Sequence, residues 1–180
     1  MAMKFRQRPA AEERLKKLAR GIEALARKDE ERIWQAREIA ELRKQSAREL
    51  HSLCAGFVAA LNSMLSGVMV ELSPAEFTET FLRDPGVNVY QINASGRLVQ
   101  VAFEVTDSPT STDKIRVPYF FEGAVRCFNQ ELLERVAIHE MPLYCCLEKG
   151  KGAWVLFDAP AQRTLPFNQE RLISMMELLL

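Results

Sequence analysis

The side chains best suited to catalysis in this sequence are its four cysteines and two histidines. Cys127, Cys145 and His139 lie close together in the sequence, and a thiol beside an imidazole can form a nucleophile with its base. No signature of a catalytic cysteine surrounds them, so we expect core cysteines and a histidine at a turn. His51 falls within a helical pattern and is expected to be a flanking residue. These observations favour a protein that is not an enzyme.

Motifs for metals, phosphates and cofactors are also sparse. No C-x-x-C or Cys/His spacing indicates a zinc site, and the carboxylates of the C-terminal part are scattered singly. The Lys-Gly-Lys-Gly run at 149–152 joins two expected strands and precedes no helix, so it lacks the geometry of a phosphate-binding loop. We therefore expect neither a metal nor a cofactor. Aromatic residues beyond residue 100 could line a small-ligand pocket, although most of them should be core.

A basic N-terminal arm offers a different chemistry. Residues 1–50 hold 14 Lys/Arg and 9 Asp/Glu, whereas residues 51–180 hold 10 and 15, so the zero net charge of the chain divides into +5 and −5. Nucleic acid or an anionic membrane could bind the arm through charge alone, although a solvated helix end is the plainer interpretation. The candidate polyanion contacts are Lys4, Arg6, Arg8, Arg14, Lys16, Lys17 and Arg20.

One long helix should carry this arm. Between Pro9 and Pro74, apolar residues recur with an average spacing of about 3.5 residues, which is typical of a left-handed coiled coil. A helix over about 9–66 would be roughly 85 Å long, and a body of residues 68–180 is too small to bury its whole apolar stripe. We therefore expect a homodimer or a higher homo-oligomer. The expected interface residues are Leu15, Leu18, Ile22, Leu25, Ile33, Ile39, Leu42, Leu50, Leu53 and Phe57.

The apolar stripe has faults that allow another interpretation. Asp29 and Arg32 interrupt it, and Gly21 weakens the helix by about 1 kcal/mol relative to Ala. Polar seam residues can fix register and strand number, but residues 28–32 could instead separate two shorter helices. We favour a continuous helix because no Gly, Pro or Asn marks a turn there.

Residues 51–70 contain no Asp, Glu, Lys or Arg. Their length is about that of a bilayer span, and small residues at four-residue spacing resemble those of membrane helix dimers. The segment also contains polar residues, and the apolar stripe continues through it in phase. We interpret it as the buried root of the long helix. The alternative is a single-pass, membrane-attached assembly component with residues 51–70 in the bilayer.

The remaining residues should form antiparallel hairpins and helices. We expect a short helix at 74–83, strands at 87–92 and 98–105, a polar loop at 106–113, a strand at 115–120, a helix at 121–137, strands at 143–148 and 153–158, and a final helix at 168–179. Adjacent strand residues point to opposite faces, so Cys145 and Cys146 should diverge. For the same reason, either Phe120 or Phe121 should face a partner or a pocket.

The sequence thus predicts an α+β protein, with a long N-terminal coiled-coil helix followed by a small domain of antiparallel hairpins and helices. The expected parts are a basic tail (1–8), the coiled-coil helix (9–67) and the globular domain (68–180). Free thiols and no signal peptide favour the reducing cytoplasm. The favoured function is a non-catalytic structural or adaptor protein, a scaffold whose helix associates copies and whose C-terminal domain docks a protein partner. The other alternative is a small-ligand sensor or enzyme domain on a coiled-coil stalk.

Overall fold

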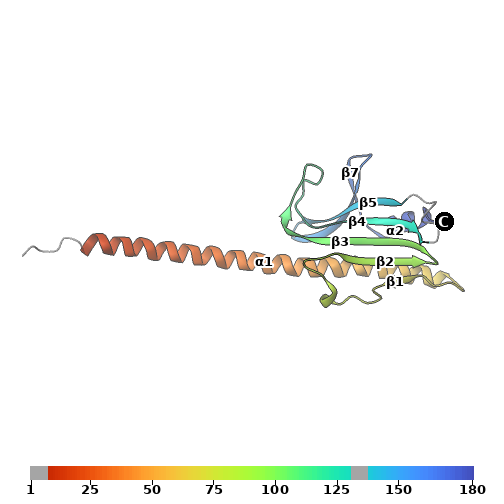
Figure 1. The fold of residues 1–180 in the computed structure, drawn as a ribbon, viewed down its shortest axis with the longest axis horizontal. Coiled ribbons are helices and arrows are strands. Elements are labelled where there is room, and N and C mark those ends of the chain that lie inside the picture. The colour runs from red at the N-terminus through yellow and green to blue at the C-terminus, as the bar shows by residue number, and fades with distance from the viewer. Residues whose placement is uncertain (1–7, 131–137) are drawn as a thin grey trace, which may run out of the picture. The chain divides into compact units, whose positions relative to one another are not determined.

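The computed structural model describes residues 8–130 and 138–180, and the side chains from residue 11 onward within these ranges. In chain order the elements are α1 (Arg8–Met64), β1 (Glu71–Ser73), the 3-10 turn η1 (Glu79–Phe81), β2 (Asn88–Ala94), β3 (Arg97–Thr110), β4 (Tyr119–Asn129), β5 (His139–Glu148), β6 (Lys151–Asp158), β7 (Arg163–Pro166) and α2 (Gln169–Glu177) (Figure 1). The chain divides into two compact units, residues 1–41 and 42–180.

The expected long helix is confirmed as α1, which is continuous through residues 28–32. The alternative of a break there is wrong, because the charged run is helical. Most residue types in this run are good helix formers. Earlier in the same helix, Lys16 forms an ion pair of 2.9 Å with Glu12, which lies one turn before it. That spacing supports a helix on its exposed surface.

The second unit is built on one antiparallel sheet of seven strands. The strands lie side by side in chain order, β1 to β7, so each pairs with its sequence neighbours. Ala94 pairs with Arg97 across a two-residue turn, in which Ser95 and Gly96 have φ angles of 52° and 84°. Two positive φ angles are the mark of a type I′ hairpin, whose closing pair is hydrogen-bonded.

One face of this sheet covers residues 42–64 of α1 (Figure 1). The Tyr90 hydroxyl of β2 donates to the Ala47 carbonyl at 3.0 Å, and Nε1 of Trp154 in β6 donates to the Ser46 carbonyl at 2.8 Å. Strands far apart in the sheet therefore hold neighbouring residues of the helix. The core around these contacts includes Leu50, Cys54, Phe57, Ile92, Val101, Phe103, Leu143, Leu156, Leu172 and Met176.

Part of the segment 51–70 belongs to this core, whereas Met64, Leu65, Val68 and Met69 are exposed. His51, Cys54 and Phe57 are buried under the sheet, and Val70 is buried where the chain returns toward β1. Among the described residues, the helices lack an apolar stretch of the length that a membrane crossing requires. The buried residues of the segment pack in the core of the second unit.

The expectation that Phe120 or Phe121 faces outward is wrong, because both are fully buried in the same core. Tyr119 pairs with Cys146 and Phe121 with Cys145, so β4 contains one residue more than β5 at this point. Such a β-bulge breaks the alternation of side chains. Phe120 is the extra residue and turns toward the helix-facing side. Cys145 and Cys146 do lie in separate clusters on the two faces, as expected.

The expected helix at 121–137 is also wrong over its described part, because residues 121–129 continue strand β4. Val125 and Phe128 have a spacing that suits a helix, but the same stretch also alternates in burial as a strand does. Its inward residues pair with core residues of β3 and β5, and this tertiary pairing decides the outcome. Residues 131–137 lie outside the described residues.

The expected helix at 74–83 shortens to η1. Ser73 cannot cap a helix there because it belongs to β1, where it pairs with Gln91. The polar loop expected at 106–113 starts later, because β3 continues to Thr110 and pairs with Tyr119. Both hairpins and the final helix are confirmed with small shifts at their ends.

Candidate interaction sites

The most exposed apolar surface in the first unit is the stripe of α1. Five large residues at helical spacing have exposed fractions between 54% and 65%. They are Leu15, Leu18, Ile22, Leu25 and Ile33. Single exposed apolar residues are ordinary, whereas these five lie along one face of the helix, with Asp29 between Leu25 and Ile33. We call these five residues the exposed stripe.

The rest of the expected interface lies differently. Leu50 and Phe57 have exposed fractions of 1% and 2% and pack in the core of the second unit. Leu42 and Leu53 are partly buried and pack against the same core, and Ile39 is partly exposed. The chain's own sheet therefore covers the C-terminal end of the predicted seam. Leu50 and Phe57 are therefore buried within the chain itself, and the exposed members of the predicted interface lie toward its N-terminal end.

The candidate polyanion contacts are only partly described. Lys4 and Arg6 lie outside the described residues, and the Arg8 side chain is not described. Arg14, Lys16, Lys17 and Arg20 are exposed on α1, with Lys16 paired to Glu12. This surface is solvated and mixed in charge.

Trp34 is an exposed residue outside the sites predicted from the sequence. Its exposed fraction is 66%, although a tryptophan on a protein surface is often a contact residue. It follows Ile33 directly, about 100° around the helix, so it lies outside the exposed stripe. A lone aromatic residue within a charged run was the available signal.

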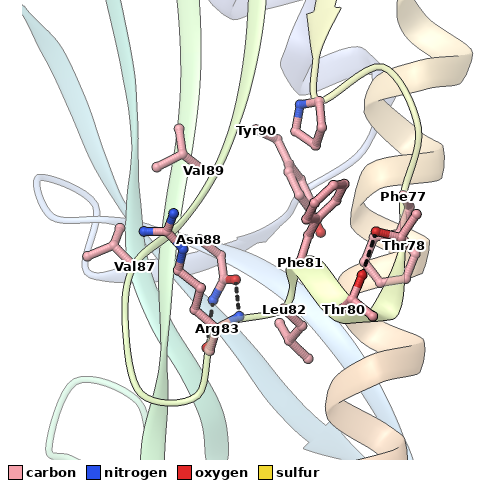
Figure 2. A pocket seen from close by; sticks show the side chains of 11 residues that line it. Phe77, Thr78, Thr80, Phe81, Leu82, Arg83, Val87, Asn88, Val89 and Tyr90 are labelled. Atoms are coloured by element: carbon pink, nitrogen blue, oxygen red, sulfur yellow. Dashed lines mark hydrogen bonds between the residues drawn. The ribbon is translucent and has the colours of Figure 1, made fainter.

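A groove of about 490 Å³ lies in the second unit between the segment 74–83 and strand β2 (Figure 2). The consecutive residues Val87, Asn88, Val89 and Tyr90 all line it. Successive side chains of a strand point to opposite faces, so a groove that touches all four lies at the edge of the strand. None of the sites predicted from the sequence includes these residues.

The wall of the groove opposite β2 is held by polar contacts. The buried Asn88 side chain accepts from the backbone N–H of Arg83 at 2.8 Å and donates to the Arg83 carbonyl at 3.2 Å (Figure 2). His51 Nε2 lies 2.8 Å from the Pro74 carbonyl. Glu79 forms an ion pair with Arg48 of α1. These contacts fix both ends of the segment and keep the groove open.

The catalytic candidates do not form an activated pair in this structure. Cys127 and His139 are directly opposite each other in the pairing of β4 with β5, but His139 is exposed and Cys127 is buried. Burial raises the pKa of the Cys127 thiol to about 11, and burial likewise raises the pKa of Cys145. An activated nucleophile has a lowered pKa instead. Among the residues with described side chains, no group of three or more His, Cys, Asp or Glu could hold a metal ion.

No protein family, curated protein or solved structure matches this chain.

Proposed function

We propose that this protein is a non-catalytic structural or adaptor protein, which self-associates through the N-terminal part of α1 and docks a partner through its C-terminal domain. The observation that carries the proposal is the exposed stripe, five large apolar residues that nothing covers within the described chain. Fully burying one such side chain contributes about 1.5–3 kcal/mol, so covering the stripe would be strongly favourable.

The stability of α1 supports the same proposal. Most helical stability in proteins comes from packing of an apolar face, and propensity alone leaves a helix marginal in water. Residues 11–41 form a helix whose side chains are almost all exposed. A second helix packed on the exposed stripe would supply the missing stabilisation.

A second copy of this chain is the occupant that the spacing favours. Leu15, Leu18, Ile22 and Leu25 follow one another at intervals of three and four residues, as the a and d positions of two heptads do. Identical helices with this spacing can interlock their side chains. Asp29 and Arg32 follow the four apolar positions and would limit the register of the pair. The opposite charges of the N-terminal and C-terminal parts of the chain would further favour contact between copies.

The test is a pair of variants that add the same charge to opposite faces of α1. Ile22→Glu places a carboxylate in the exposed stripe, and Ala24→Glu places one about 200° around the helix, outside it. Light scattering coupled to size exclusion should give an oligomer for the wild type and Ala24→Glu, and a monomer for Ile22→Glu. Equal masses for the two variants would overturn the proposal.

The four unpaired cysteines support a reducing compartment as the place where this protein works. We therefore keep the cytoplasm as part of the proposal. Localisation of a tagged full-length chain by cell fractionation would test it, and recovery with an oxidising compartment would contradict it.

A further inference from the structure

The edge of β2 is open beside the groove. β1 pairs only with Gln91, Ile92 and Asn93 of β2. The last residue of β1, Ser73, lies opposite Gln91. The next residue of β2 that can bond on this side is Val89. The backbone N–H and C=O of Ala94 point toward β3, because Ala94 belongs to the closing hydrogen-bonded pair of the hairpin. In an antiparallel sheet these groups alternate in direction, so those of even-numbered residues of β2 point toward β3 and those of odd-numbered residues point toward β1. The N–H and C=O of Val89 therefore point outward, past the end of β1.

These two groups have no protein partner in the part of the chain that the structure describes. The backbone hydrogen bonds outside the ladders do not include Val89. An open strand edge with an unpaired donor and acceptor is a template for another strand. Peptides that bind in this way gain affinity from the backbone and specificity from pockets that take alternate side chains.

The groove supplies such pockets. Phe81, Val87 and Val89 line it and have exposed fractions of 62%, 43% and 40%. Residues 87–90 span about 13 Å of extended chain, which is the length of a four-residue peptide strand. An extended peptide at this edge would lay its alternate side chains against apolar surface and cover it.

The charge of the groove is positive. Arg83 lines it and has no ion pair among the described residues. The carboxylates on either side are already engaged, because Asp84 pairs with Arg43 and Glu79 pairs with Arg48. A guanidinium left free beside an apolar groove complements a carboxylate on the ligand.

We propose that the groove beside β2 binds an extended peptide segment of a partner protein, in which apolar residues alternate with acidic ones and which adds a strand to the sheet at Val89. The inference deepens the docking role proposed above and rests on it. The peptide backbone pairs with Val89, its apolar side chains contact Phe81 and Val87, and its carboxylate pairs with Arg83.

The experiment uses the full chain and fluorescein-labelled capped pentapeptides of the form Glu-x-Thr-x-Glu, where x is Val, Ile, Leu or Phe. Fluorescence anisotropy measures affinity, and amide chemical shifts measure where the peptide lies. We expect binding tighter than about 1 mM for at least one peptide, with the Val89 amide among the most shifted. Absence of binding across the whole set overturns the inference.

Two variants separate strand pairing from simple pocket filling. Val89→Pro removes the outward N–H without touching the ladder to β3, and proline is tolerated on edge strands. It should weaken binding about tenfold, the equivalent of one hydrogen bond of about 1.4 kcal/mol. Val89→Thr keeps the backbone donor and should bind within about twofold of the wild type. Equal loss in both variants, or in neither, overturns strand addition.

A test from the ligand side does not depend on the folding of any variant. Each backbone nitrogen of the peptide is methylated in turn. Methylation of the nitrogen that pairs with Val89 should weaken the binding of the peptide, and methylation of any other nitrogen should leave its affinity unchanged. A full set of methylated peptides that bind equally well would contradict the inference and favour a pocket for a small apolar ligand.

The role of the Arg83 charge in peptide binding can be tested with a matched control variant. Arg83→Glu should weaken binding of the acidic peptides about fivefold or more, whereas Arg116→Glu, at an exposed position that does not line the groove, should not. Equal effects would show that only overall charge matters and would overturn the role of Arg83.

The assembly-deficient Ile22→Glu protein should still bind the peptides, so failure of self-association and failure of this inference are separate results.

Discussion

Gly152 is the residue that allows β6 to approach α1 closely. A β-carbon at this position would overlap Ser46 Oγ, and it would lie 2.9 Å from Cys145 Sγ and 3.0 Å from Phe120 Cζ. All three neighbours are buried side chains, so little space is open for them to move aside. The Trp154 contact with Ser46 depends on the same close approach.

We therefore expect Gly152→Ala to lower the free energy of unfolding by about 1–3 kcal/mol, the usual cost of overpacking a core. Urea denaturation followed by circular dichroism measures the change. Gly56→Ala is the matched control, since a β-carbon there meets nothing within 4 Å, and it should stabilise the helix by about 1 kcal/mol. A Gly152→Ala protein as stable as the wild type would show that α1 and β6 are not closely packed.

The buried thiols make stability depend on alkaline pH. Burial raises the pKa of Cys54 from an ordinary value of 9.0 to about 12. The unfolded chain thus loses this proton first as the pH rises, and it becomes favoured relative to the folded chain. The contribution of Cys54 to stability is complete below pH 9.0 and declines between pH 9.0 and about 12.

Cys54→Ala tests this pH dependence. The wild-type free energy of unfolding should decline above pH 9.0, and the variant should decline less steeply, by about 1.4 kcal/mol per pH unit. Urea titrations at several pH values between 8 and about 10 provide the measurement. Identical slopes for the two proteins would contradict the burial of this thiol.

At the scale of elements, two side chains connect the sheet to the helix. Tyr90 and Trp154 donate to adjacent carbonyls of α1, at Ala47 and Ser46. Trp154 also stacks on Phe121 with ring centroids 5.4 Å apart, so its loss removes packing as well as a hydrogen bond.

We expect Tyr90→Phe to cost about 0.5–1.5 kcal/mol, the value of one hydrogen bond. Trp154→Phe should cost more, because the smaller ring also leaves a cavity. Tyr144→Phe, on the opposite face of the sheet, should change stability by less than about 0.5 kcal/mol. Thermal unfolding of the three variants compares them, and a Tyr144→Phe loss equal to that of Tyr90→Phe would contradict the assigned core face.

The sequence was a good guide to elements with a long or local signal. α1 repeats its apolar spacing over many turns, and the Ser95-Gly96 turn is read from residues that tolerate positive φ. β4 has neither a long repeating pattern nor a local turn signal. Val125 and Phe128 satisfy helical spacing, while their strand partners are supplied by distant residues, Val101 and Leu98. Non-local pairing of this kind is not written in the local pattern.

Of the two candidate sites, one follows from a local sequence pattern and the other depends on contacts between distant residues. The exposed stripe could be predicted because helical spacing names its residues, but the length of α1 that the sheet covers could not, since that depends on how Ser46 and Phe57 pack. The groove was missed because it depends on β1 ending at Ser73, which pairs with Gln91, two residues short of Val89. A strand register of this kind becomes known only when the sheet is seen.

At the scale of the whole molecule, self-association should stabilise the helix of the first unit. Binding of a second copy to the folded helix favours that state by mass action. The helical signal of the wild type at a fixed temperature should therefore rise with protein concentration, and that of Ile22→Glu should not. Far-ultraviolet circular dichroism at several concentrations measures this, and a concentration-independent wild-type signal with a fully helical α1 would contradict the argument.

The most direct test of the account is the mass of the wild-type chain at sedimentation equilibrium over about 1–100 µM, the range in which moderate affinities are resolved. The account predicts a mass that approaches a multiple of 20.5 kDa as concentration rises. A single species of 20.5 kDa at every concentration would contradict it, because the exposed stripe would then remain uncovered by any copy of the chain.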